Sequence, residues 1–114
     1  MSLWKWNDVE LEVDFEDADF QERYEKAFDK LEGIEKELQK TGKLSEITKK
    51  YCEMFWTLYD DIFGEGTAEA LFHGKKNSRA CEECYDSFIT FCTEQVKEIN
   101  KKRNFRFAKY KVKK

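Results

Sequence analysis

The sequence contains no proline, a single histidine and no long apolar run. Proline removes a backbone donor and clashes with the preceding helical turn, so its absence favours long uninterrupted helices. A lone histidine restricts acid–base chemistry near neutral pH. No apolar stretch approaches the roughly 18 residues that a membrane helix needs. Because the N-terminus also lacks the basic and apolar regions of a signal peptide, we expect a cytoplasmic protein without membrane contact.

Acidic residues are absent after Glu98. The first 100 residues carry 13 Lys and Arg against 24 Asp and Glu, a balance of −11, although the whole chain has a net charge of only −3. The segment Lys101–Lys114 carries eight basic residues and no acidic one, a balance of +8. The sequence therefore predicts an acidic body followed by a basic end, which are electrostatically complementary.

Aromatic residues are abundant, with ten Phe, five Tyr and three Trp in 114 residues. This content is too high for a disordered chain and indicates one compact domain with an aromatic core. Four cysteines are present. A disulfide framework is not expected in a chain without a secretion signal, so we interpret the cysteines as free thiols.

The first residues alternate in polarity, which predicts strands over residues 3–6 and 9–14. Trp4 and Trp6 share one face of the first strand. Asn7 and Asp8 between the runs tolerate the positive φ angles of a tight turn. We therefore expect a β-hairpin at residues 3–14, which must pack on helices because an isolated hairpin is only marginally stable.

Apolar spacings of three and four residues predict helices over the ranges 18–40, 44–63, 67–73 and 78–102. The fold class expected is mainly α (α+β): an N-terminal hairpin, three main helices and one short helix in a bundle-like domain spanning residues 1–102. Beyond it, Phe105 and Phe107 alternate with polar residues, which favours an added strand or a disordered basic tail at residues 103–114.

The corner Phe63–Ala68, FGEGTA, has two glycines before a helix start, and helix N-termini bind anions. However, a phosphate-binding loop has the pattern GxxxxGK[ST] and follows a strand. This corner lacks that pattern and follows a predicted helix. Glu65 also places negative charge where a phosphate would lie. We interpret Gly64 as the helix ending, Gly66 as the bend and Thr67 as the cap of the next helix.

His73, Cys81 and Cys84 could supply three zinc ligands, with Cys52 or Cys92 as the fourth. The single CxxC falls inside a predicted helix and lacks a second ligand pair, so we favour cysteines buried in the core. No residue pattern of a nucleophile with its base is present, and neighbouring carboxylates such as Asp60 and Asp61 diverge on a helix. The sequence thus predicts a protein that is not an enzyme and uses no cofactor, metal or small-molecule substrate.

The basic end allows three interpretations. Its lysines could neutralise phosphates while Phe105, Phe107 and Tyr110 stack on bases, as in a nucleic-acid-binding arm. It could instead contact an acidic surface on a partner protein or on another copy of the chain, which would favour head-to-tail assembly. It could also be a solvated terminus. The acidic body, which repels a polyanion, favours protein contact.

Several runs resemble a family of small phage and prophage proteins of Firmicutes that have no assigned function. The matching residues are Glu10, Leu11, Val13 and Asp14, then the runs Asp17–Asp19 and Tyr24–Ala27, then the most specific run, Phe63–Ala68, followed by Leu71–Phe72, Gly74–Lys75 and Asn77. The resemblance covers nearly the whole chain up to about residue 100. It implies a small product of the phage tail region, similar to the tail assembly chaperones that coat the helical tape-measure protein in the host cytoplasm.

From residues and resemblance together, we predict a non-enzymatic tail assembly factor that binds a phage tail protein, or itself, through apolar and aromatic surface. The alternatives are a small nucleic-acid-binding accessory protein and a zinc-binding adaptor. Trp4 and Trp6 are expected anchors if they are exposed, because Trp is enriched among binding hot spots; Trp56 is expected in the core. The residues predicted to contact a partner are Trp4, Trp6, Phe105, Phe107, Lys109, Tyr110 and Lys111.

Overall fold

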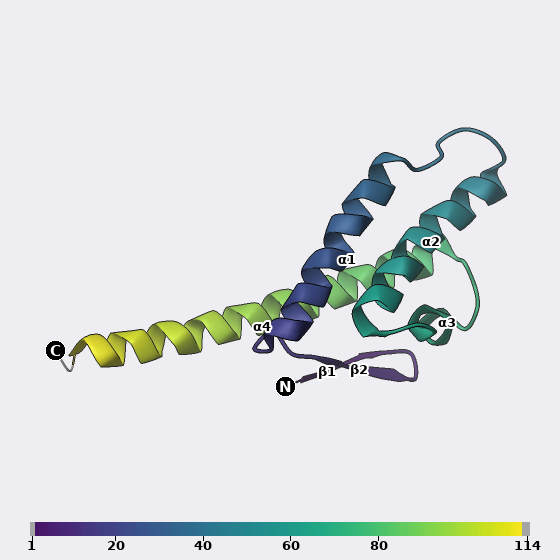
Figure 1. Ribbon diagram of the computed structural model, residues 1–114. Helices are drawn as coiled ribbons and strands as arrows, with labels where there is room; N and C mark the ends of the chain where they lie inside the picture. The colour runs from purple at the N-terminus through teal and green to yellow at the C-terminus, as the bar shows by residue number, and fades with distance from the viewer. Residues whose placement is uncertain (1, 113–114) are drawn as a thin grey trace.

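The computed structural model describes the backbone of residues 2–112 and the side chains of residues 2–109. An N-terminal hairpin precedes four helices, and this mainly α fold with one small sheet confirms the expected fold class (Figure 1). The molecule measures 66 × 31 × 21 Å, with a radius of gyration of 17.3 Å. A compact domain of this length would have a radius of about 13 Å, so the shape is clearly elongated.

The hairpin pairs β1 (Ser2–Trp6) with β2 (Val9–Val13), close to the predicted ranges. Asn7 occupies the turn with a φ of 53°, as expected, and its side-chain amide donates to the carbonyl of Leu71 at 2.8 Å. The Trp4 indole N–H donates to the hydroxyl of Ser87 at 3.1 Å, while its ring lies 5.0 Å from that of Phe88. These contacts fix the hairpin onto the helices.

Helix α1 (Ala18–Lys36) is capped by Asp17, whose carboxylate accepts from the amide of Asp19 at 3.2 Å. It ends four residues before the predicted position of 40, so that boundary was wrong. After Lys36 the backbone tightens, and the amide of Leu38 donates to the carbonyl of Glu35. The Gln39 side chain then donates to the Thr41 carbonyl at 2.9 Å. These bonds satisfy the helix end and the loop in place of another turn.

Helix α2 (Leu44–Phe63) has the predicted bounds and is the central helix of the body. It buries six side chains, among them Phe55, Leu58 and Tyr59, against its neighbours. The short helix α3 (Thr67–Phe72) follows through the glycine corner and buries Ala68, Leu71 and Phe72. Trp56 of α2 is only half-buried, and its ring stacks on Phe72 at 6.1 Å.

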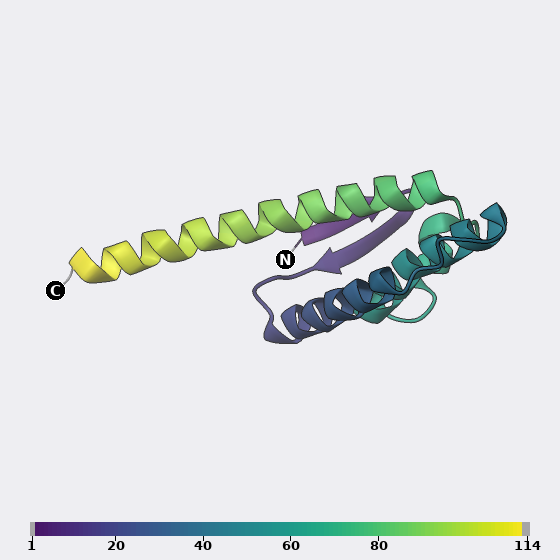
Figure 2. The ribbon, with the colours of Figure 1, turned by 90° about the horizontal axis from the view of Figure 1, so that it is seen from above.

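Helix α4 (Ser78–Val112) is one continuous helix of 35 residues that runs beside the hairpin and continues well past it (Figure 2). The expected helix end at residue 102 and the proposed strand or disordered tail were therefore wrong for the described residues up to 112. Its last buried side chain is Ile99. At 1.5 Å per residue, residues 100–112 extend the helix by about 20 Å beyond that point.

Two physical reasons explain the helical extension. The helix is already nucleated by its anchored part, so adding turns costs little compared with starting a new element. The basic residues also lie at the helix C-terminus, where the macrodipole favours cations. The spacing of Phe105 and Phe107 suggested a strand, but β1 and β2 pair only with each other in the described part of the chain.

We expect Trp4→Ala to lower the free energy of unfolding by about 3–5 kcal/mol, because it removes a buried ring and leaves a cavity. Trp6→Ala should cost clearly less, since Trp6 is only half-buried. The matched control is Leu3→Ala in the same strand, whose side chain is 56% exposed, and it should change stability by about 0.5 kcal/mol or less. Urea unfolding followed by far-UV circular dichroism measures all three. Equal losses for Trp4 and Leu3 would contradict the packing described.

Candidate protein-binding site on helix α4

The glycine corner forms a turn between helices. Gly64 and Gly66 have φ angles of 117° and 92°, which other residues rarely adopt. Gly66 itself occupies the cap position of α3, so the assignment of Thr67 as the cap was wrong. The Thr67 hydroxyl instead donates to the Gly64 carbonyl at 2.7 Å. The Asp60 carboxylate accepts from the amide of Ala68 at 2.9 Å, so a protein carboxylate already satisfies this helix start.

The cysteines and the histidine lie in different surroundings. All four thiols are free and buried, whereas His73 is exposed at the end of α3. Within residues 2–112 no cluster of three or more His, Cys, Asp or Glu residues is arranged to hold a metal ion. The structure thus does not bring His73 together with Cys81 and Cys84, and the zinc-binding alternative gains no support from the geometry.

Burial changes the chemistry of the thiols. It raises the pKa of Cys84 and Cys92 to about 12, and it also raises the pKa of Cys52 and Cys81. The thiolate is the reactive and metal-binding form of cysteine, so these side chains remain neutral over the physiological range. They act as small apolar side chains in the core.

Because the folded pKa of these thiols lies above the unfolded value of about 8.5, their contribution to stability is complete below that value. It is lost as the pH rises toward about 12, the pKa of buried Cys92. We therefore expect the free energy of unfolding to fall as the pH is raised above about 8.5. Cys92→Ala should be less stable at neutral pH but show a shallower decline, in urea titrations at a series of pH values.

A thiol reagent provides the control for that prediction. Native protein at neutral pH should react slowly, while the denatured chain should expose four thiols. Fast native labelling of all cysteines, or a Cys92→Ala variant whose stability declines as steeply as the wild type, would contradict the role assigned to burial.

The predicted anchor Trp4 is not available to a partner, because its side chain is only 2% exposed and packs in the core. Trp6 is half-buried against the same core. The alternating pattern placed both on one face correctly, but this face is turned inward. Trp4 is therefore a core residue, and its prediction as a binding anchor was wrong.

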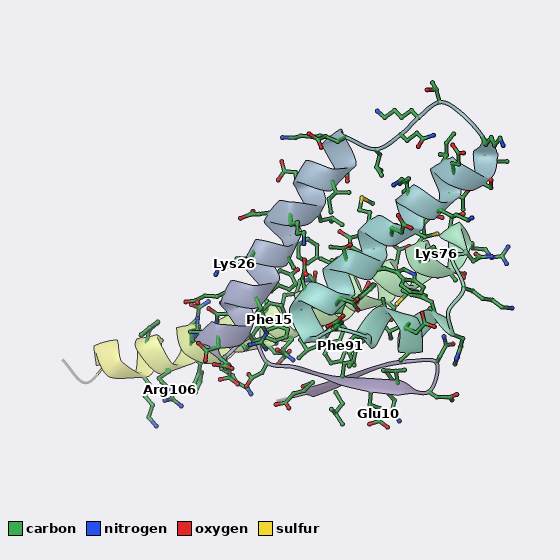
Figure 3. All side chains as sticks on the ribbon, turned by 45° about the vertical axis from the view of Figure 1, so that its right-hand side comes forward. Glu10, Phe15, Lys26, Lys76, Phe91 and Arg106 are labelled. Carbon is green, nitrogen blue, oxygen red and sulfur yellow. The ribbon has the colours of Figure 1, made fainter. Side chains whose placement is uncertain are left out.

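The other predicted contact residues lie on the projecting part of α4. Phe105 and Phe107 are 76% and 59% exposed, and Lys109 is also exposed. The side chains of Tyr110 and Lys111 lie outside the described residues. Figure 3 shows Arg106 on this segment, clear of the hairpin and of α1. Every side chain from 101 to 109 is exposed, so the end of the helix is open to a partner.

Phe105 lies among cations on one side of the helix. Glu98, Lys101, Lys102, Arg106 and Lys109 line a shallow hollow with it; we call these six residues the Phe105 surface. Lys101 and Lys109 are one turn before and one turn after the ring, on the same helix face. The sequence analysis did not single out Lys101, Lys102 or Arg106, because the predicted helix ended at residue 102 and the face that they share with Phe105 was therefore not apparent.

A second surface was missed entirely. Where α1, α2 and the first turns of α4 meet, a groove of about 580 Å³ has the buried side chains Leu31, Met54 and Phe55 in its lining. Its exposed carboxylates are Glu35, Glu82 and Asp86. We call it the acidic groove. No sequence pattern could have identified it, because its residues come from three helices whose crossing is set by tertiary packing.

No helix in the described part of the chain combines the length and apolar character needed to cross a membrane. A model of the family of unknown function DUF6673 matches residues 7–114. No curated protein and no solved structure matches the chain.

Proposed function

We propose that the chain, which belongs to the family of unknown function DUF6673, acts without catalysis by binding another protein through the Phe105 surface. The observation that carries this proposal is the exposure of Phe105, 76%, on a helix held clear of the body. A large exposed aromatic side chain framed by cations is typical of a binding hot spot. The interaction is a helix presented to a groove, which needs no catalytic residue.

The shape of the segment favours a protein over a nucleic acid. A separation of two residues along a helix corresponds to a rotation of about 200°, so the side chains of Phe105 and Phe107 point to different sides. They do not form a common platform on which neighbouring bases could stack. Glu98 also lies within the Phe105 surface, where it would oppose a phosphate backbone. A protein groove needs only one of these faces.

The resemblance to phage tail-region proteins suggests the biological setting. We propose a role in tail assembly, with the tape-measure protein as the partner, because a long helical chain offers repeated surfaces to a projecting helix. Such a role requires reversible binding rather than turnover. The compact body would then hold α4 in place, while the end of the helix makes the contact.

We expect Phe105→Asp to reduce capture of the tape-measure protein by at least about tenfold, since loss of a hot-spot side chain typically costs 2 kcal/mol or more. The measurement is a pull-down of tagged protein from cells that express the neighbouring tail genes. Leu44→Asp is the matched control, because Leu44 is 78% exposed but lies at the start of α2. It should capture the partner as well as the wild type.

The same variants distinguish the nucleic-acid alternative. If the wild type fails to capture any tail protein but is retained on DNA at low salt and released steeply as salt rises, the proposal is wrong and the basic end binds polyanions. Equal capture by Phe105→Asp and the wild type would also contradict it, because the contact would then lie elsewhere.

A further inference from the structure

The acidic groove has the composition of a binding site for a basic, aromatic segment. Its floor is apolar and its carboxylates lie at the margin, on α1 and on α4. Its volume of about 580 Å³ falls within the range of roughly 300–1,000 Å³ typical of ligand clefts. One carboxylate is held in position, because the Tyr51 hydroxyl donates to Glu82 at 2.7 Å.

The carboxylates of the groove lack cations of their own. The four ion pairs among the described side chains join other residues, and none includes Glu35, Glu82 or Asp86. Glu82 and Asp86 are four residues apart on α4, a spacing at which like charges destabilise a helix. Cations brought by a partner would remove this repulsion.

The Phe105 surface carries the complementary chemistry. One exposed ring is flanked by Lys101 and Lys109 on the same helix face, with Lys102 and Arg106 beside it. Its cations repel one another as the groove's carboxylates do, since Lys102 and Arg106 are also four residues apart. An aromatic ring entering the apolar floor would therefore bring lysines to the acidic margin.

The two surfaces cannot meet within one molecule. Tyr85, beside the groove, and Phe105 lie on the same unbroken helix. Twenty residues separate them, which corresponds to about 30 Å along the helix axis. A straight helix cannot return to its own beginning, so the complementary partner must be a different chain.

We propose that the Phe105 surface of one copy docks into the acidic groove of another copy of this chain. The inference rests on the proposed function, which assigns protein binding to the same Phe105 surface. It adds that one protein bound by this surface is a second copy of the chain, through its acidic groove. Because the two surfaces differ, the contact is heterologous and extends head to tail unless it closes into a ring. Because the contact would join one exposed ring and a few charged side chains, we expect association to depend on concentration and salt.

The test is sedimentation of the full chain over a range of concentrations at low and high salt. The mass should rise above that of the monomer at low salt and return to it at high salt. Glu82→Lys with Asp86→Lys changes the charge of the acidic groove from −3 to +1. Lys101→Glu with Lys109→Glu changes the charge of the Phe105 surface from +3 to −1. Each of these variants alone should weaken association by at least about tenfold, because both of its surfaces then carry the same sign.

Mixing the two variants restores complementarity at both contacts, so the mixture should associate as the wild type does. This rescue would not follow from unfolding of either variant. The matched control, Glu12→Lys with Glu65→Lys, makes the same charge change at exposed sites outside the groove and should associate normally. Circular dichroism verifies that all variants retain their helices.

A wild-type protein that stays monomeric at every concentration would overturn this inference, as would a mixture that fails to associate. If such a protein still captured the tape-measure protein through Phe105, the proposed function would stand without the self-association. If copies associate with charge-swap rescue but no tail protein is captured, the self-association stands and the proposed function fails.

Discussion

The structure depends on how the middle of α4 is fastened to the hairpin. Gln95 donates to the Val13 carbonyl at 2.9 Å and accepts from the Phe15 amide at 2.7 Å, so one side chain satisfies both groups where the strand ends. Trp4 adds its contact with Phe88 two turns earlier. Since α4 contains neither Gly nor Pro, nothing bends it after these contacts. The direction of its exposed end is therefore set inside the core.

Local signals predicted most of this fold. The alternation around Asn7 gave the hairpin, and Gly64 marked the end of α2 at the observed position. The structure of the basic segment was predicted wrongly, because the spacing of Phe105 and Phe107 is that of a strand and carries no information about the residues before it. In the structure this segment follows helical turns that Gln95 already anchors. Propagation from an existing helix is cheaper than forming a strand without a partner.

The candidate sites were less predictable, because they depend on which face packs inward. A Trp at position 4 fits a surface hot spot and a core equally well, and only the packing of Tyr59 and Phe88 around it makes it a core residue. The acidic groove joins Glu35 to Glu82 through a crossing of helices that no short-range pattern encodes. By contrast, the change from acidic to basic residues after Glu98 was visible in the sequence, although the projection of the basic helix end away from the body was not.

Because the basic helix end projects from the body, its charges lie too far from the acidic groove to interact with it within one molecule. The Phe105 surface lies about 30 Å along α4 from the acidic groove, several times the Debye length of about 8 Å at physiological salt. The carboxylates of the acidic groove therefore neither neutralise the basic end of the same molecule nor protect it from a polyanion. Selection between partners must come from shape at close range, where a single ring with a lysine one turn to either side matches a concave, acid-lined groove. A stacked nucleic acid would need both phenylalanines on one face, and the helix separates them.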